Sequence, residues 1–154
     1  MAGLPLFDQL LKYYPQASPD AVKKAIGGKV DADWITNTCT IRLSRAFNYA
    51  GVAVPRNFSG MKVISGADMK YYAYRVREMK QWLKFRFGKS DLDGAKPVDR
   101  KAFVDKKGVI AFDIHFTDAT GHVDLWDGST YTHEAVDPED YFVLATNVVL
   151  WIAP

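Results

Sequence analysis

The sequence predicts an α+β domain in which N-terminal helices pack on an antiparallel sheet. Apolar residues recur at helical spacing in the first half of the chain, and the period changes to alternation in the second half. Turn signals rich in Gly and Asp separate the predicted strands. The 154 residues are 48% hydrophobic and 25% charged. This composition fits one globular domain over residues 1–154.

The first two helices are marked by local start and stop signals. Residues 6–14 form a short amphipathic segment that Pro15 stops. Ser18-Pro19-Asp20 begins the next helix, because Ser accepts a free first-turn N–H and Pro suits the first helical position. Gly27-Gly28 ends it, and residues 29–36 are expected to be irregular or extended.

Two further helices follow. One runs from about Thr38 to Tyr49, with Asn37 or Thr38 as its cap and Gly51 as its end. The other is a long helix that ends at Gly88, followed by a loop from residue 90 to 98. Their apolar positions are Ile41, Leu43, Ala46, Phe47 and Ala50, then Met69, Ala73, Val76, Met79, Leu83 and Phe87.

The second half reads as consecutive strands. Residues 109–116 form one strand, and residues 118–121 form a turn. Residues 122–126 alternate polar and apolar side chains, as a half-buried strand does. Asp127-Gly128 is a second turn signal. Residues 147–152 are a final apolar strand.

Charge and cysteine content exclude several classes of protein. A formal net charge of +2 is too small to imply a nucleic-acid or membrane partner, so we expect neither. A single cysteine excludes an intramolecular disulfide and a multi-cysteine zinc site. The start MAGLPLFDQLLKYYP lacks the basic and apolar regions of a Sec signal peptide, and no apolar run reaches membrane-spanning length. We expect synthesis in a cytoplasm and, if the protein acts elsewhere, export by another route.

Cys39 is the only thiol, and it falls in the first turn of a predicted helix. The free N–H groups and the macrodipole there favour the thiolate and can also hold an oxyanion. This position therefore suits a nucleophile. The alternative is a small buried hydrophobic residue, which is the commoner role of a lone cysteine.

A catalytic thiol needs a base, and three histidines are available. His122 opens a strand, where its ring can face a neighbouring helix end. His133 lies in the next strand or its leading loop, which brings it close to His122. His115 is expected to face solvent from an earlier strand. As a structural alternative, His122 pairs with Asp124 or caps a turn.

Two rival functions remain open at this stage. A zinc-dependent hydrolase would use His122, Asp124 and His133, with His115 as a possible fourth ligand, but no H-E-x-x-H spacing is present. A non-enzymatic module would bind an anionic ligand through the basic, aromatic segment of residues 70–89. The structural alternative for that segment is a core stripe with a solvated basic face.

Two motifs resemble a known family. NTCTIRLS, residues 37–44, is similar to the nucleophile helix C-x-I-R-[ML]-S of the fourth family of type VI secretion amidase effectors. GHVDLWDG, residues 121–128, is similar to that family's G-H-[IV]-x-L-W-[ND]-G. The agreement continues in the right order over nearly the whole chain, at residues 26–28, 65–68, 74–76, 87–89, 107–110 and 150–154.

The resemblance implies a papain-like fold of the NlpC type and a cysteine peptidase that needs no cofactor or metal. It implies a DL-endopeptidase that cuts the γ-D-glutamyl–meso-diaminopimelate bond of peptidoglycan stem peptides. It also implies delivery by the type VI secretion apparatus into the periplasm of a rival cell. A cognate immunity protein would plug the cleft in the producing cell.

The catalytic residues carried over are Cys39, His122 and His133, and one of them departs from the family. Members commonly have an aspartate at the position of His133, between two cysteines that this chain lacks. A neutral imidazole can still accept the base's N–H. Glu134 and Asp137 are the alternative third residues, and Asp124 ranks below them if it faces away.

Three side chains are predicted to bind substrate: Arg42, Asn37 and Trp126. Arg42 follows Cys39 by one helical turn, where it can raise the local potential or hold a substrate carboxylate. A structural salt bridge is its equal alternative. For Trp126 the alternative is a place in the core, which is usual for a strand tryptophan.

Overall fold

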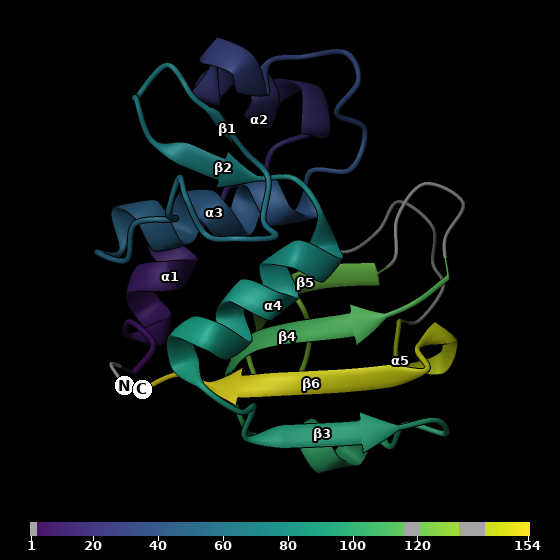
Figure 1. Cartoon of the computed structure of the whole chain (residues 1–154). Helices are drawn as coiled ribbons and strands as arrows, with labels where there is room; N and C mark the ends of the chain where they lie inside the picture. The colour runs from purple at the N-terminus through teal and green to yellow at the C-terminus, as the bar shows by residue number, and fades with distance from the viewer. Residues whose placement is uncertain (1–2, 116–120, 133–140) are drawn as a thin grey trace.

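The helices and strands come from a computed structural model that describes residues 3–115, 121–132 and 141–154 (Figure 1). The helices are α1 Phe7–Tyr13, α2 Pro19–Ile26, α3 Cys39–Tyr49, α4 Val76–Phe87 and α5 Tyr141–Leu144, with 3₁₀ turns η1 Gly28–Val30 and η2 Arg100–Phe103. The strands are β1 Val63–Ser65, β2 Tyr71–Ala73, β3 Leu92–Ala95, β4 Gly108–Asp113, β5 Gly121–Trp126 and β6 Asn147–Ile152. None of the described helices is long and apolar enough to span a membrane.

An antiparallel four-stranded sheet organises the second half of the chain. Its order is β3-β6-β4-β5, and β1 and β2 form a separate two-stranded ribbon. Figure 1 shows α4 crossing one face of the sheet and α3 lying above it, with the ribbon and α2 beyond α3. β5 is therefore an edge strand of the sheet, and α3 contacts it.

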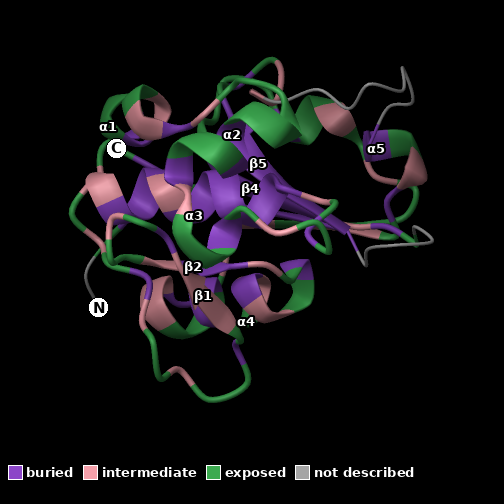
Figure 2. Cartoon of the chain, turned by 90° about the horizontal axis from the view of Figure 1, so that it is seen from above, coloured by how far each residue is buried: buried purple, intermediate pink, exposed green. Residues whose placement is uncertain are grey.

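The core is divided by the sheet. Val109, Ala111 and Val123 face one side, where they pack with side chains of α1, α3 and α4. Ile110 and Phe112 face the other side, where they pack with side chains of η2 and α5. Figure 2 shows buried residues running through β4, β5 and α3 in the middle of the molecule. The two elements that meet at the site are therefore both anchored in the core.

Local signals give most helix boundaries correctly. The Ser18 hydroxyl accepts a hydrogen bond from the Ala21 N–H at 3.3 Å, and Pro19 is the first residue of α2. Gly27 ends that helix with a φ of 70°, which a residue with a Cβ adopts only under strain. The predicted strands at residues 122–126 and 147–152 are confirmed as β5 and β6.

Two predictions in the middle of the chain are wrong. The long helix begins only at Val76, because Tyr71–Ala73 is strand β2, paired with Val63–Ser65. The loop predicted over residues 90–98 contains strand β3, which pairs with β6 at the edge of the sheet. Both short strands depend on partners distant in sequence, so local periodicity does not reveal them.

Gly121 marks a close approach between β4 and β5, immediately before His122. A Cβ at this position would lie 2.1 Å from the Phe112 carbonyl oxygen. We expect Gly121→Ala to lower the free energy of unfolding by about 2–4 kcal/mol, because the strands must separate to admit the methyl group. Urea denaturation measures this change. Gly3→Ala is the control, since a Cβ there meets no atom within 4 Å. Equal stability of the two variants would contradict the close approach of β4 and β5.

Candidate active site

Cys39 is the first residue of α3, and its side chain is only 3% exposed. The Cys39 N–H donates to Asn37 Oδ1 at 3.1 Å, so Asn37 caps this end of the helix. The Thr38 hydroxyl instead accepts from Arg42 Nε at 3.1 Å. The Cys39 N–H, which we expected to be free to hold an oxyanion, is therefore already hydrogen-bonded within the protein.

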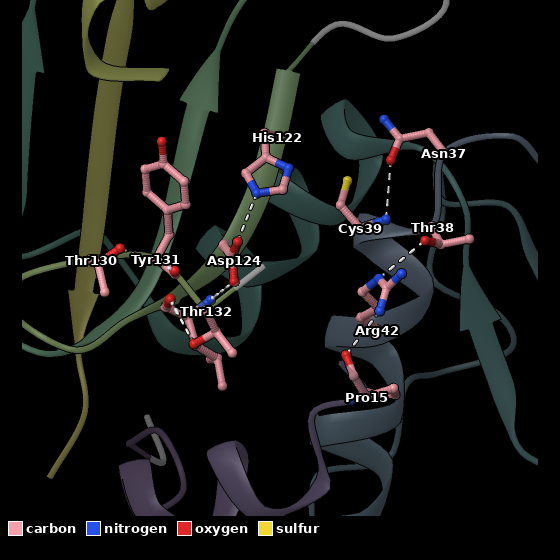
Figure 3. Close-up of polar contacts among 11 residues, drawn as sticks. Pro15, Asn37, Thr38, Cys39, Arg42, His122, Asp124, Thr130, Tyr131 and Thr132 are labelled. Carbon is pink, nitrogen blue, oxygen red and sulfur yellow. Dashed lines mark hydrogen bonds and ion pairs between the residues drawn. The ribbon is translucent and has the colours of Figure 1, made fainter. Parts of the chain in front are cut away.

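His122 is the second residue of β5, and its ring lies between Cys39 and Asp124 (Figure 3). His122 and Asp124 are two positions apart on one strand, so their side chains point to the same face. The distance from His122 Nε2 to Asp124 Oδ2 is 2.8 Å. The structural alternative for His122, pairing with Asp124, is present in the structure, and Asp124 does not face away.

This contact assigns the tautomer of His122. An ionised carboxylate only accepts hydrogen bonds, so Nε2 carries the proton that is shared with Asp124. The other ring nitrogen, Nδ1, then faces the side on which the Cys39 sulfur lies (Figure 3). The arrangement suits proton exchange between the thiol and Nδ1, while Nε2 stays bound to Asp124.

The charge state of His122 reflects both neighbours. Burial alone lowers the pKa of His122, because desolvation disfavours the imidazolium. The hydrogen bond to Asp124 and the adjacent Cys39 thiol outweigh burial and raise the pKa of His122 to about 9. An imidazolium that persists at neutral pH stabilises a neighbouring thiolate.

Aromatic rings fix the His122 ring on its remaining sides. The Tyr141 ring stacks on it with a centroid separation of 4.4 Å. The rings of Phe112 and Tyr131 lie at 6.2 Å and 6.3 Å. The imidazole therefore has a defined orientation, set by packing as well as by its hydrogen bond.

A buried polar layer lies beneath the thiol and the imidazole. Arg42 is 0% exposed and donates through Nη1 to the carbonyl oxygens of Pro15 and Ala17 at 3.0 Å and 2.8 Å. Burial lowers the pKa of Arg42, and the nearby Tyr14 and Asp124 oppose this effect. Arg42 thus places a buried positive charge near Asp124.

Tyr14 belongs to the same layer. Its side chain is 3% exposed, and its hydroxyl has no hydrogen bond of standard geometry to any described residue. Burial raises the pKa of Tyr14 well above its ordinary value, and the nearby Asp124 and Cys39 add to the rise. A neutral phenol therefore lies close to the Asp124 carboxylate.

The other predicted site residues fall into three groups. Arg42 and Trp126 are fully buried, and the Trp126 indole N–H donates to the Phe103 carbonyl at 2.9 Å, so neither offers a surface to a substrate. Asn37 is partly exposed beside the thiol, as substrate binding requires. The predicted third residues, His133, Glu134 and Asp137, lie outside the described residues.

The metal-site alternative needs His133, which lies outside the described residues. Of its other two members, His122 Nε2 and Asp124 Oδ2 are hydrogen-bonded to each other. Among the residues that the structure describes, no three His, Cys, Asp or Glu side chains form a group that could hold a metal. His115 is exposed beyond the end of β4, as expected.

The basic segment of the binding-module alternative is the outer face of α4. Its buried residues, Val76, Met79, Trp82 and Leu83, face the core. Lys80 pairs with Asp113 at 2.9 Å and Arg75 with Glu78 at 3.2 Å. Basic residues of α4 also line a cavity of about 700 Å³ over β6, but neither Cys39 nor His122 lines it. This cavity is thus separate from the thiol.

The sequence analysis ranks Asp124 too low as a site residue and does not identify Tyr14. For Asp124 a signal is available, because a residue two positions after His122 shares its face of the strand. For Tyr14 there is none, since only the tertiary packing of α1 against α3 brings it to the site.

Comparisons with known proteins agree on one family. The family model of type VI secretion system amidase effector protein 4, Tae4, matches residues 35–151. No curated protein matches the chain in a sequence search. The match region includes Cys39, His122 and Asp124.

Solved structures with the same fold cover the whole chain. The Tae4–Tai4 effector–immunity complex from Enterobacter cloacae is 32% identical, with a TM-score of 0.88 over 98% of this chain and 99% of that one. The Tae4/Tai4 effector–immunity system from Salmonella typhimurium is 33% identical, with a TM-score of 0.89 over 99% and 100%. These likenesses confirm the predicted papain-like fold of the NlpC type. The chain belongs to the Tae4 family of type VI secretion system amidase effectors.

Proposed function

We propose that this amidase effector is an antibacterial DL-endopeptidase that cleaves the γ-D-glutamyl–meso-diaminopimelate bond of peptidoglycan stem peptides. Residues 1–154 act as one catalytic domain. The observation that carries the proposal is the position of Cys39 at the start of α3, beside a His122 ring already oriented by its own strand.

Acylation uses the two side chains together. The thiol proton passes to His122 Nδ1, and Cys39 Sγ attacks the γ-glutamyl carbonyl carbon. The tetrahedral intermediate collapses as Nδ1–H protonates the amine of diaminopimelate, which leaves with its new N–H bond. The glutamyl group remains bound to sulfur as a thioester.

Deacylation reverses the proton path. The neutral imidazole takes a proton from a water molecule, which attacks the thioester carbonyl and releases the glutamyl carboxylate. The proton then returns to the sulfur or remains on His122 as an imidazolium beside a thiolate. The raised pKa of His122, about 9, favours the protonated imidazole, which stabilises a neighbouring thiolate.

Asn37 is the substrate-binding residue that the geometry favours. Its Oδ1 atom accepts from the Cys39 N–H, and its partly exposed side chain also carries an Nδ2 donor (Figure 3). A substrate oxyanion can replace Oδ1 on the Cys39 N–H or accept directly from Nδ2. Asn37 thus combines capping of α3 with contact to the scissile carbonyl.

The cellular setting follows from the family. The chain would be made in the cytoplasm, exported by the type VI secretion apparatus, and active in the periplasm of a rival cell. The solved relatives are effector–immunity complexes of Tae4 with Tai4. We therefore expect a cognate immunity protein that binds this chain and covers the region around Cys39.

Digestion of purified sacculi followed by mass spectrometry of the muropeptides tests the proposed bond. We expect products that end in D-glutamate, together with free diaminopimelyl peptides. Iodoacetamide should abolish the release of these products, whereas a chelator should not. Cleavage at another bond would overturn the bond assignment, and inhibition by the chelator alone would favour the zinc hydrolase.

A further inference from the structure

We propose that Asp124 is the positioning residue for His122: its buried carboxylate holds the Nε2 proton and keeps the imidazole charged and aimed at Cys39. The inference rests on the proposed thiol mechanism. It assigns to a residue of β5 itself the role that the family resemblance gives to His133.

The Asp124 carboxylate is held at both oxygens. Oδ1 accepts the Leu125 N–H at 2.7 Å, and Oδ2 lies 2.8 Å from His122 Nε2. The side chain is 0% exposed. A buried carboxylate with both oxygens engaged has one orientation, so it can transmit that orientation to the ring.

Hydrogen bonds and a nearby positive charge compensate the burial of the Asp124 carboxylate. Transfer of a carboxylate out of water is costly unless positive charge and hydrogen bonds compensate it. The backbone N–H of Leu125 and the His122 ring supply hydrogen bonds, and the buried Arg42 guanidinium supplies a nearby positive charge. Tyr14, the other polar group close to Asp124, stays a neutral phenol.

Besides the Cys39 sulfur, Asp124 is the group facing His122, among the described residues, that stabilises a positive charge on the ring. Cys39 faces the ring from α3, Tyr141 stacks on it from α5, and Tyr131 lies near its edge. Aromatic rings orient an imidazole but carry no formal charge. In the imidazolium Nδ1 carries the proton that it exchanges with the Cys39 sulfur, Nε2 carries the proton shared with Asp124, and the carboxylate offsets the positive charge.

Asp124→Asn is the discriminating variant. It keeps the shape of the side chain but removes the negative charge, and its single oxygen cannot accept from both the Leu125 N–H and Nε2–H. The hydrogen bond to Asp124 is the largest influence that raises the pKa of His122, so weakening it lowers this pKa from about 9. In the wild type the alkaline limb of kcat/KM on a purified soluble muropeptide should lie near pH 9. In the variant it should move down by more than about one unit, with KM little changed.

A second readout needs no substrate. An imidazolium beside Cys39 stabilises its thiolate, so the ratio of the iodoacetamide alkylation rate at pH 6 to that at pH 10 reports whether His122 is charged. In Asp124→Asn the ratio of these alkylation rates should fall by at least about tenfold, because loss of the imidazolium lowers the thiolate fraction at pH 6. A purely structural role for Asp124 would change the unfolding midpoint but leave this ratio unaltered.

Asp127→Asn is the matched control. Asp127 lies in the exposed turn after β5, where its Oδ1 accepts from the N–H groups of Ser129 and Thr130. The same substitution there should leave both pH profiles unchanged. Circular dichroism checks that each variant is folded at every pH used.

His133→Ala separates this inference from its rival. If His133→Ala moves the alkylation ratio and Asp124→Asn does not, the assignment of Asp124 is overturned. If Asp124→Asn moves it, the assignment stands whatever His133→Ala does to turnover. Full activity of Cys39→Ala would instead remove the thiol mechanism itself, which is a different outcome from an unchanged Asp124→Asn.

Discussion

Cys39→Ala is expected to lower the cleavage of sacculi by at least about 10⁴-fold, because it removes the only atom that can form the acyl-enzyme bond. His122 and Asp124 remain, but neither can replace the sulfur as nucleophile at this position. The measurement is the rate of muropeptide release, followed over hours so that a small residual activity is detected.

Folding of this variant is not at risk. Cys39 is 3% exposed and belongs to the core between α3 and the sheet, and its truncation removes one sulfur atom. We expect a loss of about 1 kcal/mol or less in the free energy of unfolding. Urea denaturation tests this, and an unfolded Cys39→Ala would not count in favour of catalysis.

Thr40→Val provides the matched control in the same helical turn. The Thr40 hydroxyl is buried, and no described residue makes a hydrogen bond with it. Valine keeps the shape of threonine, so activity and stability should remain close to those of the wild type. Full activity of Cys39→Ala beside this control would show that the thiol is not the nucleophile.

The sequence predicts helix boundaries best where local start and stop signals, such as caps and glycines, are present. Ser18-Pro19-Asp20 starts α2 and Gly27 ends it, because caps and positive φ angles act within a few residues. The start of α3 at Cys39 is equally local. These three boundaries depend on contacts between residues that are only a few positions apart, so the sequence alone predicts them.

The sequence does not predict strands that exist only through a distant partner. Met69, Ala73 and Val76 fit a helical stripe, yet Tyr71–Ala73 pairs with β1. Asp93 and Gly94 are poor strand formers, and they lie in β3 because β6 offers free backbone groups. Tertiary pairing overrides local preference in both places.

The candidate site divides in the same way. Cys39 and His122 are found from a helix start, a strand start and the family motifs that contain them. Asp124 ranks low from sequence because the motif does not show where its side chain points, although the two-residue period of a strand places it beside His122. The buried position of Arg42 has no sequence signal, since a charged residue one turn after a nucleophile suggests contact with substrate.

Arg42→Met is the substitution in this cluster with the largest expected effect on stability. Methionine fills much of the same space but leaves the carbonyl oxygens of Pro15 and Ala17 without their donor. It also removes the buried positive charge near Asp124. Loss of one partner from a buried charged network costs about 3–5 kcal/mol, and urea denaturation should show a loss of this size.

Two further variants test whether the stability loss in Arg42→Met comes from the lost hydrogen-bond geometry or from the lost positive charge. Arg77 is exposed on α4, so Arg77→Met should change the free energy of unfolding by less than about 0.5 kcal/mol. Arg42→Lys keeps the charge, but a single ammonium cannot reach the Thr38 hydroxyl and both carbonyl oxygens in the geometry that the planar guanidinium uses. We expect it to lie between Arg42→Met and the wild type. If Arg42→Met were as stable as Arg77→Met, the hydrogen bonds that join α3 to the segment after α1 would contribute nothing, and the buried layer beneath Cys39 would need another explanation.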